Sequence, residues 1–458
     1  MVKIYIDNQS YDVESGKNLL ETCLSLKLNL PYFCWHPAFG SVGACRQCAV
    51  KQFKNENDSH GKIVMSCMTP VTDNARISIL DSEAAAFRAS VIEWLMINHP
   101  HDCPVCDEGG ECHLQDMTLM TGHIHRRFRF KKRTFQNQDL GPFINHEMNR
   151  CIACYRCVRF YREYAGGHDL NVFGTHDRVY FGRHEDGILE NEFSGNLVEV
   201  CPTGVFTDKT LQKHYTRKWD LQTAPSVCTH CGLGCNTLPG ERYGTLRRIQ
   251  NRYHHDINGY FICDRGRYGY GFVNSDKRNI DIWLRSERTA PFFKVTKADV
   301  DTYLSRSLSD PTQLPRTLGI GSPRASLEAN FALQTLVGAE NFYHGMSEVD
   351  GRLVSLILDI LRDGPVSSAS LREVEQADIV FILGEDITNT APRLALAVRQ
   401  SIRNLSKELS RRLKIPDWQD AAARDAAQDK KGPLFVAALY QTKLDEVATQ
   451  TYHANPDD

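Results

Sequence analysis

Potential metal ligands gather in the first 263 residues of this chain, and this grouping constrains the fold more than any other feature. Fifteen of the sixteen cysteines, together with one histidine, form four groups of four. Four protein ligands are what an iron–sulfur cluster or a structural zinc ion needs. The groups are Cys34, Cys45, Cys48 and Cys67; His99, Cys103, Cys106 and Cys112; Cys151, Cys154, Cys157 and Cys201; and Cys228, Cys231, Cys235 and Cys263. The sequence therefore predicts a series of metal-stabilised domains, followed by a different kind of domain without cysteines.

Length and composition favour a cytoplasmic metalloprotein. The 458 residues suffice for about three or four domains. We expect no signal peptide, because the N-terminus lacks a charged region followed by an apolar one, and no membrane span, because no run of eighteen apolar residues occurs. In a reducing compartment, clustered cysteines indicate metal or redox chemistry rather than disulfides. A formal net charge of −2 gives no whole-chain reason to bind nucleic acid.

The third group has the most specific spacing. Cys151, Cys154 and Cys157 are each separated by two residues, and the remote Cys201 is followed by Pro202. Such a run with a Cys–Pro pair is typical of bacterial [4Fe–4S] ferredoxins. A tetrahedral zinc site usually takes two ligands from each of two loops and seldom uses a third cysteine at that interval. The spacing therefore predicts a [4Fe–4S] cluster.

The first group indicates a [2Fe–2S] cluster. Plant-type ferredoxins use the spacing C-x4-C-x2-C with a remote cysteine. Here the gap from Cys34 to Cys45 is longer, but Gly40 and Gly43 keep the loop small and flexible. Short strand patterns, beginning with the hairpin KIYID and QSYDV, favour a β-grasp ferredoxin domain. The spacing alone leaves zinc as an alternative.

The second group needs a histidine to reach four ligands. A helix is predicted over residues 82–98, and Pro100 disfavours helix at His99, so His99 should face the loop DCPVCDEGGEC. His101 is a competitor, but only one residue separates it from Cys103, which strains a shared chelate. We expect His99 to complete a [4Fe–4S] site, and its neutral imidazole to change the reduction potential and proton coupling of that cluster.

The fourth group fits either a [4Fe–4S] cluster or a zinc ribbon, and its three neighbours favour iron–sulfur. The tail from about residue 290 alternates strand and helix patterns, which predicts a parallel α/β sheet. These segments are LPRTLGIGS, ASLEANFALQTLV, ADIVFILGEDIT, PRLALAVRQSIR and PLFVAALY. The turns GIGS and GEDITN lie where such sheets bind nucleotides, although structural turns explain them equally well.

Two features fall outside the four groups. Cys23 is predicted to be a small buried apolar residue. The basic, aromatic segment HIHRRFRFKKR (123–133) could bind a nucleic-acid backbone, but a solvated arm or a contact with an acidic partner subunit is favoured.

As a set, the four groups resemble the large iron–sulfur (G) subunit of bacterial respiratory complex I, the NADH:quinone oxidoreductase. The motifs that carry the resemblance are CWHPAFGSVGACRQC, NHPHDCPVCDEGGECHLQD, RCIACYRCVRFYRE with EVCPTG, and CTHCGLGCN with CDRGRYGYGFVN. The tail is more weakly similar to the molybdopterin-oxidoreductase fold. That fold normally continues well past residue 458, so we expect an incomplete subunit.

The resemblance implies an α+β region followed by an α/β region. Five domains are expected: 1–82, a [2Fe–2S] ferredoxin-like β-grasp domain; 83–122, a His(Cys)3-ligated [4Fe–4S] domain; 123–217, a bacterial-ferredoxin-like [4Fe–4S] domain; 221–277, a molybdopterin-oxidoreductase-type [4Fe–4S] domain; and 278–458, an incomplete molybdopterin-oxidoreductase-like α/β domain.

The resemblance also implies a function. The four groups would hold, in order, one [2Fe–2S] and three [4Fe–4S] clusters, and the first three would relay electrons from the flavin subunit, which oxidises NADH, toward the subunits that reduce quinone. The fourth cluster lies off this path in the family. The chain would thus belong to a proton-pumping enzyme without itself binding NADH or quinone, and without catalytic side chains. Its partners would be the flavin/NADH-binding and quinone-side iron–sulfur subunits, not nucleic acid, at the cytoplasmic face of the inner membrane.

Two alternatives stay open. One is the catalytic subunit of a molybdenum-dependent, NAD-linked formate dehydrogenase, which would bind a molybdopterin. Such enzymes commonly carry a lysine after the fourth cysteine, where this chain has Arg265, and the tail has no cysteine to bind molybdenum. We therefore expect no molybdopterin. The other alternative is a zinc-stabilised binding scaffold. An iron-only hydrogenase would need cysteines that the tail lacks.

Overall fold

The structure is a computed structural model that describes residues 1–308, 317–428, 430–455 and 457. The chain divides into two units, one made of Met1–Tyr270 with Ser370–Asp458 and the other of Gly271–Ala369. The region expected as a single α/β tail is thus shared between both units. Helices and strands occur in both, which agrees with the predicted mixture of α and β structure.

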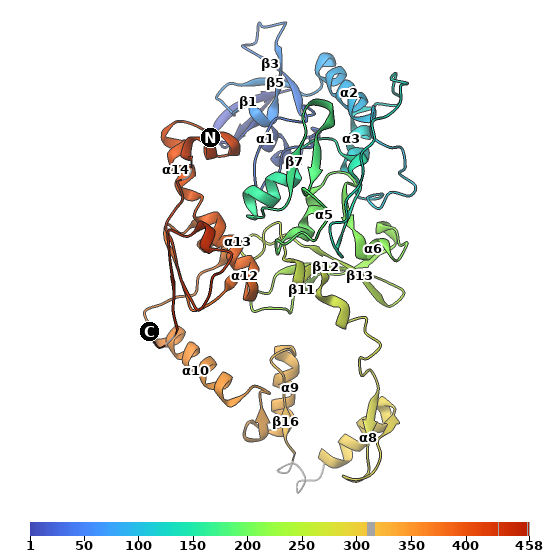
Figure 1. Ribbon diagram of the computed structural model, residues 1–458, viewed down its shortest axis with the longest axis vertical. Helices are drawn as coiled ribbons and strands as arrows, with labels where there is room; N and C mark the ends of the chain where they lie inside the picture. The colour runs from blue at the N-terminus through green and yellow to red at the C-terminus, as the bar shows by residue number, and fades with distance from the viewer. Residues whose placement is uncertain (309–316, 429, 456, 458) are drawn as a thin grey trace. The chain divides into compact units, whose positions relative to one another are not determined.

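The N-terminal residues form a mixed five-stranded sheet in the order β2-β1-β5-β3-β4. Its strands are β1 (Val2–Ile6), β2 (Gln9–Val13), β3 (Ala49–Phe53), β4 (Lys62–Met65) and β5 (Arg76–Ser78). β1 and β2 form the predicted hairpin, with Asp7 and Asn8 both at positive φ in a tight turn. β1 pairs with β5 in parallel. Helix α1 (Leu19–Ser25) lies beside the sheet (Figure 1, blue) and buries Cys23 against Ile4 and Ile6, as predicted for that cysteine.

Two helices frame the second ligand group, namely α2 (Ser82–Met96) and α3 (His113–Thr121). The side chain of Asp81 caps α2 by accepting hydrogen bonds from two backbone N–H groups of its first turn. Buried Arg88 of α2 donates to the carbonyl oxygens of Ala49 and Ile79, both at 2.8 Å, which fixes the helix on the sheet. The helix ends before His99, as predicted.

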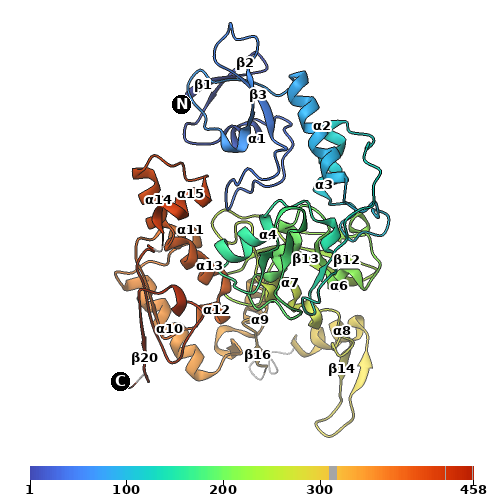
Figure 2. The ribbon, with the colours of Figure 1, turned by 45° about the horizontal axis from the view of Figure 1, so that its top comes forward.

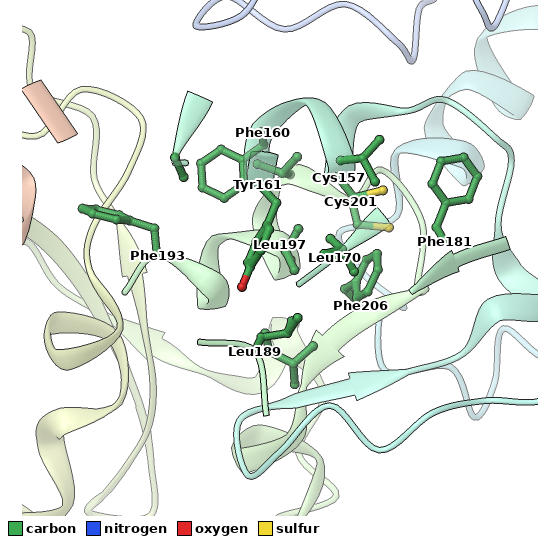
Figure 3. Close-up of a cluster of buried hydrophobic side chains, with 14 of the residues drawn as sticks. Cys157, Phe160, Tyr161, Leu170, Phe181, Leu189, Phe193, Leu197, Cys201 and Phe206 are labelled. Carbon is green, nitrogen blue, oxygen red and sulfur yellow. The ribbon is translucent and has the colours of Figure 1, made fainter. Parts of the chain in front are cut away.

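The third and fourth ligand groups lie on short elements around a shared core. These elements are α4 (Arg156–Val158), a π-helical turn (Arg159–Tyr164), α5 (Leu197–Val200), α6 (Lys209–Gln212) and α7 (Asp264–Tyr268), with strands β6 (Ile144–His146), β7 (Asn171–Phe173), β8 (Tyr180–Gly182), β9 (Phe206–Asp208), β10 (Gln222–Thr223), β11 (Ser226–Val227), β12 (Asn236–Arg242) and β13 (Thr245–Asn251). Aromatic and aliphatic side chains fill this core, among them Phe160, Tyr161, Phe181 and Phe206 (Figure 3). The strands pair antiparallel in small ribbons, so the ligand loops rest on packed side chains more than on a large sheet.

Residues 370–458 return to the first unit as a small parallel α/β layer. Its elements are α11 (Leu371–Gln376), β18 (Val380–Leu383), α12 (Ile387–Thr390), α13 (Pro392–Ser401), α14 (Asn404–Arg412), α15 (Asp420–Ala427), β19 (Leu434–Ala438) and β20 (Gln450–His453). The strands pair in parallel in the order β18-β19-β20. Helices α14 and α15 pack side by side (Figure 2, red). The parallel sheet predicted from ADIVFILGEDIT and PLFVAALY is therefore confirmed.

The second unit carries β14 (Ile282–Leu284), β15 (Phe293–Val295), α8 (Lys297–Leu308), β16 (Gly319–Ile320), α9 (Leu327–Val337), β17 (Phe342–Tyr343) and α10 (Glu348–Asp363). β16 and β17 pair in parallel, with α9 between them in sequence. This agrees with the predicted strand in LPRTLGIGS and helix in ASLEANFALQTLV, although residues 314–316 of the first segment lie outside the described residues.

Candidate iron–sulfur cluster sites

The sulfur atoms of the first group lie together in the interior. Cys34, Cys45, Cys48 and Cys67 are all buried. The backbone N–H of Cys34 donates to Cys45 Sγ at 3.4 Å, and that of Cys67 donates to Cys48 Sγ at 3.5 Å. Hydrogen bonds with Cys45 and Cys67 lower the pKa of Cys34, and a hydrogen bond with Cys67 lowers that of Cys48. Four buried cysteines, two of whose sulfurs accept hydrogen bonds from backbone N–H groups, are a suitable donor set for a metal cluster.

The second group is brought together only in part. Cys106 and Cys112 are buried near each other, and burial raises the pKa of Cys112 to about 11. Cys103 lies exposed. His99 is 8% exposed, and its Nδ1 has no hydrogen-bond partner among the described residues. Burial lowers the pKa of His99 to about 4, so its imidazole is neutral, as a metal ligand must be.

His101, the competitor for the second group, has different surroundings. Its side chain is exposed, and its Nδ1 lies 3.3 Å from Lys132 Nζ. A buried, unpartnered imidazole nitrogen needs a hydrogen-bond partner or a metal, whereas an exposed one is satisfied by water. The geometry therefore favours His99 over His101 as the fourth ligand of the second group.

The four cysteines of the third group line one small cavity. Ile152, Phe181, Val205 and Phe206 are among the other residues that line it. Ala153 and Tyr155 both have positive φ, which turns the backbone sharply enough for closely spaced cysteines to face one space. Figure 3 shows the sulfurs of Cys157 and Cys201 pointing to the same side, toward Phe181. Burial raises the pKa of Cys154 to about 12, with Cys201 contributing, so these thiols stay protonated until a cation is present.

The fourth group also surrounds a cavity. Cys228, Cys231, Cys235 and Cys263 line it together with Gly266 and Arg393. A Cβ atom at Gly266 would lie 3.4 Å from Cys228 Sγ and 3.8 Å from Cys263 Sγ, so this glycine keeps space beside two sulfurs. Burial, and then the other three cysteines, raise the pKa of Cys235 to about 12. Among the described residues, no three His, Cys, Asp or Glu side chains converge as a single-ion site does. The donor chemistry and the cavities of the third and fourth groups fit iron–sulfur clusters.

Ligands from three groups meet in one apolar cluster of side chains. Cys34 and Cys45 of the first group, Cys112 of the second and Cys154 of the third are buried there together with Phe33, Ile92, Leu114, Met117 and Ile152. We call this cluster the apolar junction. Cys157 and Cys201 of the third group share another cluster with Cys263 of the fourth. Loops that are far apart in sequence are thus joined through an apolar interior.

Buried arginines bind the ligand loops to one another, a role that sequence reasoning missed. Arg159, 4% exposed, donates to the carbonyl oxygens of Cys34 at 3.2 Å and of Phe39. Arg150 binds Asp102 at 2.7 Å and so ties the third group to the second. In the sequence, the only sign of this role is that each arginine lies within two residues of a cysteine. That position does not distinguish a buried arginine from an exposed one.

Family comparisons divide the chain in the same order as the ligand groups. Residues 1–81 match a 2Fe-2S iron-sulfur cluster binding domain, and 88–127 match the NADH-ubiquinone oxidoreductase-G iron-sulfur binding region. Residues 141–207 match the ferredoxin-like domain of NADH-quinone oxidoreductase subunit 3, and 221–275 match the molybdopterin oxidoreductase Fe4S4 domain. The expected presence of both 2Fe–2S and 4Fe–4S cluster domains is confirmed.

Curated relatives match along the whole chain. The G subunits of NADH-quinone oxidoreductase from Pseudomonas fluorescens and Yersinia pestis are each 58% identical to it over 458 residues, covering 100% of this chain and 50% of the relative. Over its whole length the chain is similar to the G subunits of NADH-quinone oxidoreductase. The G subunit of Escherichia coli K12 is 56% identical over 459 residues, and the chain spans about half the length of these relatives. The resemblance inferred from the four motifs is confirmed.

One solved structure shows a more distant likeness. An NAD+-reducing [NiFe]-hydrogenase in the H2-reduced state has a TM-score of 0.40 and 25% sequence identity, covering 45% of this chain and 87% of that chain. Among the described residues, no helix is long and apolar enough to cross a bilayer.

Proposed function

We propose that this chain is the electron-transfer part of the G subunit in a respiratory NADH:quinone oxidoreductase. The observation that carries the proposal is the apolar junction, which gathers ligands of three groups in one buried cluster of contacts. Electron transfer needs redox centres close together and shielded from water, and such a junction supplies both conditions. The similarity to NADH-quinone oxidoreductase G subunits supports NADH and quinone as the substrates of the whole complex, at sites on other subunits.

The ligand groups are proposed to hold one [2Fe–2S] cluster at Cys34, Cys45, Cys48 and Cys67, and [4Fe–4S] clusters at His99, Cys103, Cys106 and Cys112, at Cys151, Cys154, Cys157 and Cys201, and at Cys228, Cys231, Cys235 and Cys263. When bound, these clusters take up and release single electrons. The protein supplies thiolate and imidazole ligands, backbone N–H donors such as that of Cys34, and a water-excluding wall. No molybdopterin is proposed.

The domain plan and the surroundings follow from the same proposal. The mixed sheet with α1 beside it supports a β-grasp ferredoxin domain over residues 1–82. We place four further domains after it, at residues 83–122, 123–217, 221–277 and 278–458. The partners would be the flavin/NADH-binding subunit and the quinone-side iron–sulfur subunits, with the chain peripheral at the cytoplasmic face of the membrane.

Metal analysis of the anaerobically purified chain tests this function. We expect about fourteen irons per chain with matching acid-labile sulfide, no molybdenum, and distinct [2Fe–2S] and [4Fe–4S] EPR signals after dithionite reduction. Molybdenum with pterin would support the formate dehydrogenase instead. Zinc with little iron, persisting after anaerobic reconstitution, would contradict electron transfer and support a scaffold.

A further inference from the structure

Arg393 is a buried guanidinium with one side unsatisfied. It lies in the first turn of α13 and is 4% exposed. Its Nε donates to the carbonyl oxygen of Asn258 at 3.0 Å, and its Nη2 donates to Glu375 Oε1 at 2.7 Å. Its Nη1 is buried and has no hydrogen-bond partner among the described residues. A buried charged donor without an acceptor is costly, so Nη1 indicates a missing acceptor.

The same side chain lines the cavity of the fourth ligand group. Arg393 and Pro392 line this cavity together with the four cysteines. Two hydrogen bonds fix the orientation of the guanidinium, so Nη1 is the donor left for the cavity.

The charge of Arg393 is not cancelled by its carboxylate partner. Glu375 also binds Arg372 Nη1 at 2.9 Å, so two arginines share one carboxylate and the three side chains together are positive. Since Arg372 is about half exposed and Arg393 is buried, Arg393 brings the excess charge of these three side chains to the cavity, which the exposed Arg265 also lines.

We propose that Arg393 donates a hydrogen bond from Nη1 to a sulfur of the [4Fe–4S] cluster held by Cys228, Cys231, Cys235 and Cys263, and so raises the reduction potential of that cluster. This inference rests on the proposed function, which places a cluster there. Reduction adds one electron to the cluster and neither forms nor breaks a covalent bond. The more negative, reduced cluster attracts the cation and its N–H more strongly, which stabilises the reduced form. Arg393 is thus a positioning and tuning residue, not a ligand.

An anaerobic redox titration followed by EPR tests the effect. The signal of the fourth cluster is assigned by its loss in Cys228→Ser. In Arg393→Gln we expect the ratio of reduced to oxidised fourth cluster at a fixed potential to fall at least tenfold, which is about 59 mV for one electron, while the other clusters titrate unchanged. Arg399→Gln is the matched control, because Arg399 lies on the same helix but pairs with Glu446 at 3.0 Å, and it should leave the ratio unchanged.

A second measurement detects the hydrogen bond itself. With 15N-labelled arginine, pulsed EPR of the reduced fourth cluster should show a 15N coupling that disappears in Arg393→Lys, which keeps the charge but lacks Nη1. If Arg393→Gln fails to keep the fourth cluster, Arg393→Lys still tests the hydrogen bond. A coupling that persists in Arg393→Lys, or a ratio in Arg393→Gln within twofold of wild type, would overturn the inference and leave the proposed function intact. Wild-type protein without a fourth cluster signal and with about four irons too few would instead contradict the cluster assignment.

Discussion

At the scale of single residues, buried charged and polar side chains hold the ligand loops in place. Arg159 follows Cys157 on the third loop, yet its hydrogen bonds go to carbonyl oxygens of the first loop. Its guanidinium also stacks against Phe39 with 5.1 Å between the guanidinium carbon and the ring centre. One side chain therefore connects two ligand groups.

Arg159→Met should destabilise the fold by about 3 kcal/mol, because several buried carbonyl oxygens lose a charged donor. Chemical denaturation of the anaerobic chain measures this difference. Arg162→Met is the matched control, since Arg162 lies on the same turn but is exposed and binds Asn171 at 2.7 Å. It should change stability by less than about 0.5 kcal/mol. Equal effects of both substitutions would contradict the connecting role of Arg159.

His146 should make stability depend on pH. Burial lowers its pKa to about 4, and its ring accepts from the N–H of Gln138 and donates to the carbonyl of Phe181 at 3.0 Å. In the unfolded chain this histidine binds a proton as pH falls through about 6.5, whereas in the folded chain it stays neutral down to about pH 4. The free energy of unfolding therefore has its full value above pH 6.5 and decreases as pH falls toward 4. Chemical denaturation should show that the free energy of unfolding falls by up to roughly 3 kcal/mol between pH 7 and pH 4.5. This decrease should be smaller in His146→Gln.

A control for this pH effect is His60→Gln, which changes an exposed histidine. It should keep the wild-type dependence on pH. If His146→Gln kept it too, another group would have to be its source.

At the scale of elements, an ion-pair network anchors the second ligand loop to β13. Lys218 Nζ lies 2.9 Å from Glu108 and 3.1 Å from Glu111, and Arg248 of β13 binds Glu111 at 3.0 Å. Glu108 and Lys218 are nearly fully buried. The loop that contains Cys106 and Cys112 is thus held by charges from outside its own segment.

Lys218→Met should destabilise the chain by about 3–5 kcal/mol, because it leaves a buried carboxylate without its cation. Hydrogen exchange should also become faster in residues 103–112. The double variant Lys218→Met with Glu108→Gln should recover part of the loss, because the unpaired charge is then removed. Strictly additive effects would show that the two side chains do not interact.

At the scale of the whole molecule, the second unit carries a strongly apolar helix face. On α10, Val349, Leu353, Leu356, Ile357 and Ile360 are each 47–66% exposed. Monomeric proteins rarely leave large contiguous apolar patches open to water, and such patches promote association.

The isolated chain should therefore self-associate through α10. Leu353→Glu with Ile357→Lys should lower the apparent mass in light scattering, without changing the iron content. Asp359→Lys, a charge change at an exposed position of the same helix, should not lower it. Unchanged association in the double variant would exclude α10 as the contact.

Local features of this protein were predictable from the sequence. The run Cys151, Cys154 and Cys157, the first hairpin, the end of α2 before His99, and the strands β18 and β19 follow from spacing, turn residues and short hydrophobic patterns. These depend on neighbours along the chain, where backbone geometry and side-chain period act directly. The similarity to G subunits was recognised as a resemblance of four sequence motifs taken together.

Contacts between segments far apart in sequence were decided only by the tertiary structure. The apolar junction of Cys34, Cys112 and Cys154, the span of Arg159 to the first loop, and the approach of Arg393 to the fourth group have no local signal. The return of residues 370–458 to the first unit was likewise not predictable from the pattern of its strands. Burial and pairing are properties of the packed chain. An arginine in the sequence does not indicate whether its side chain will be exposed on the surface or buried beside a ligand group.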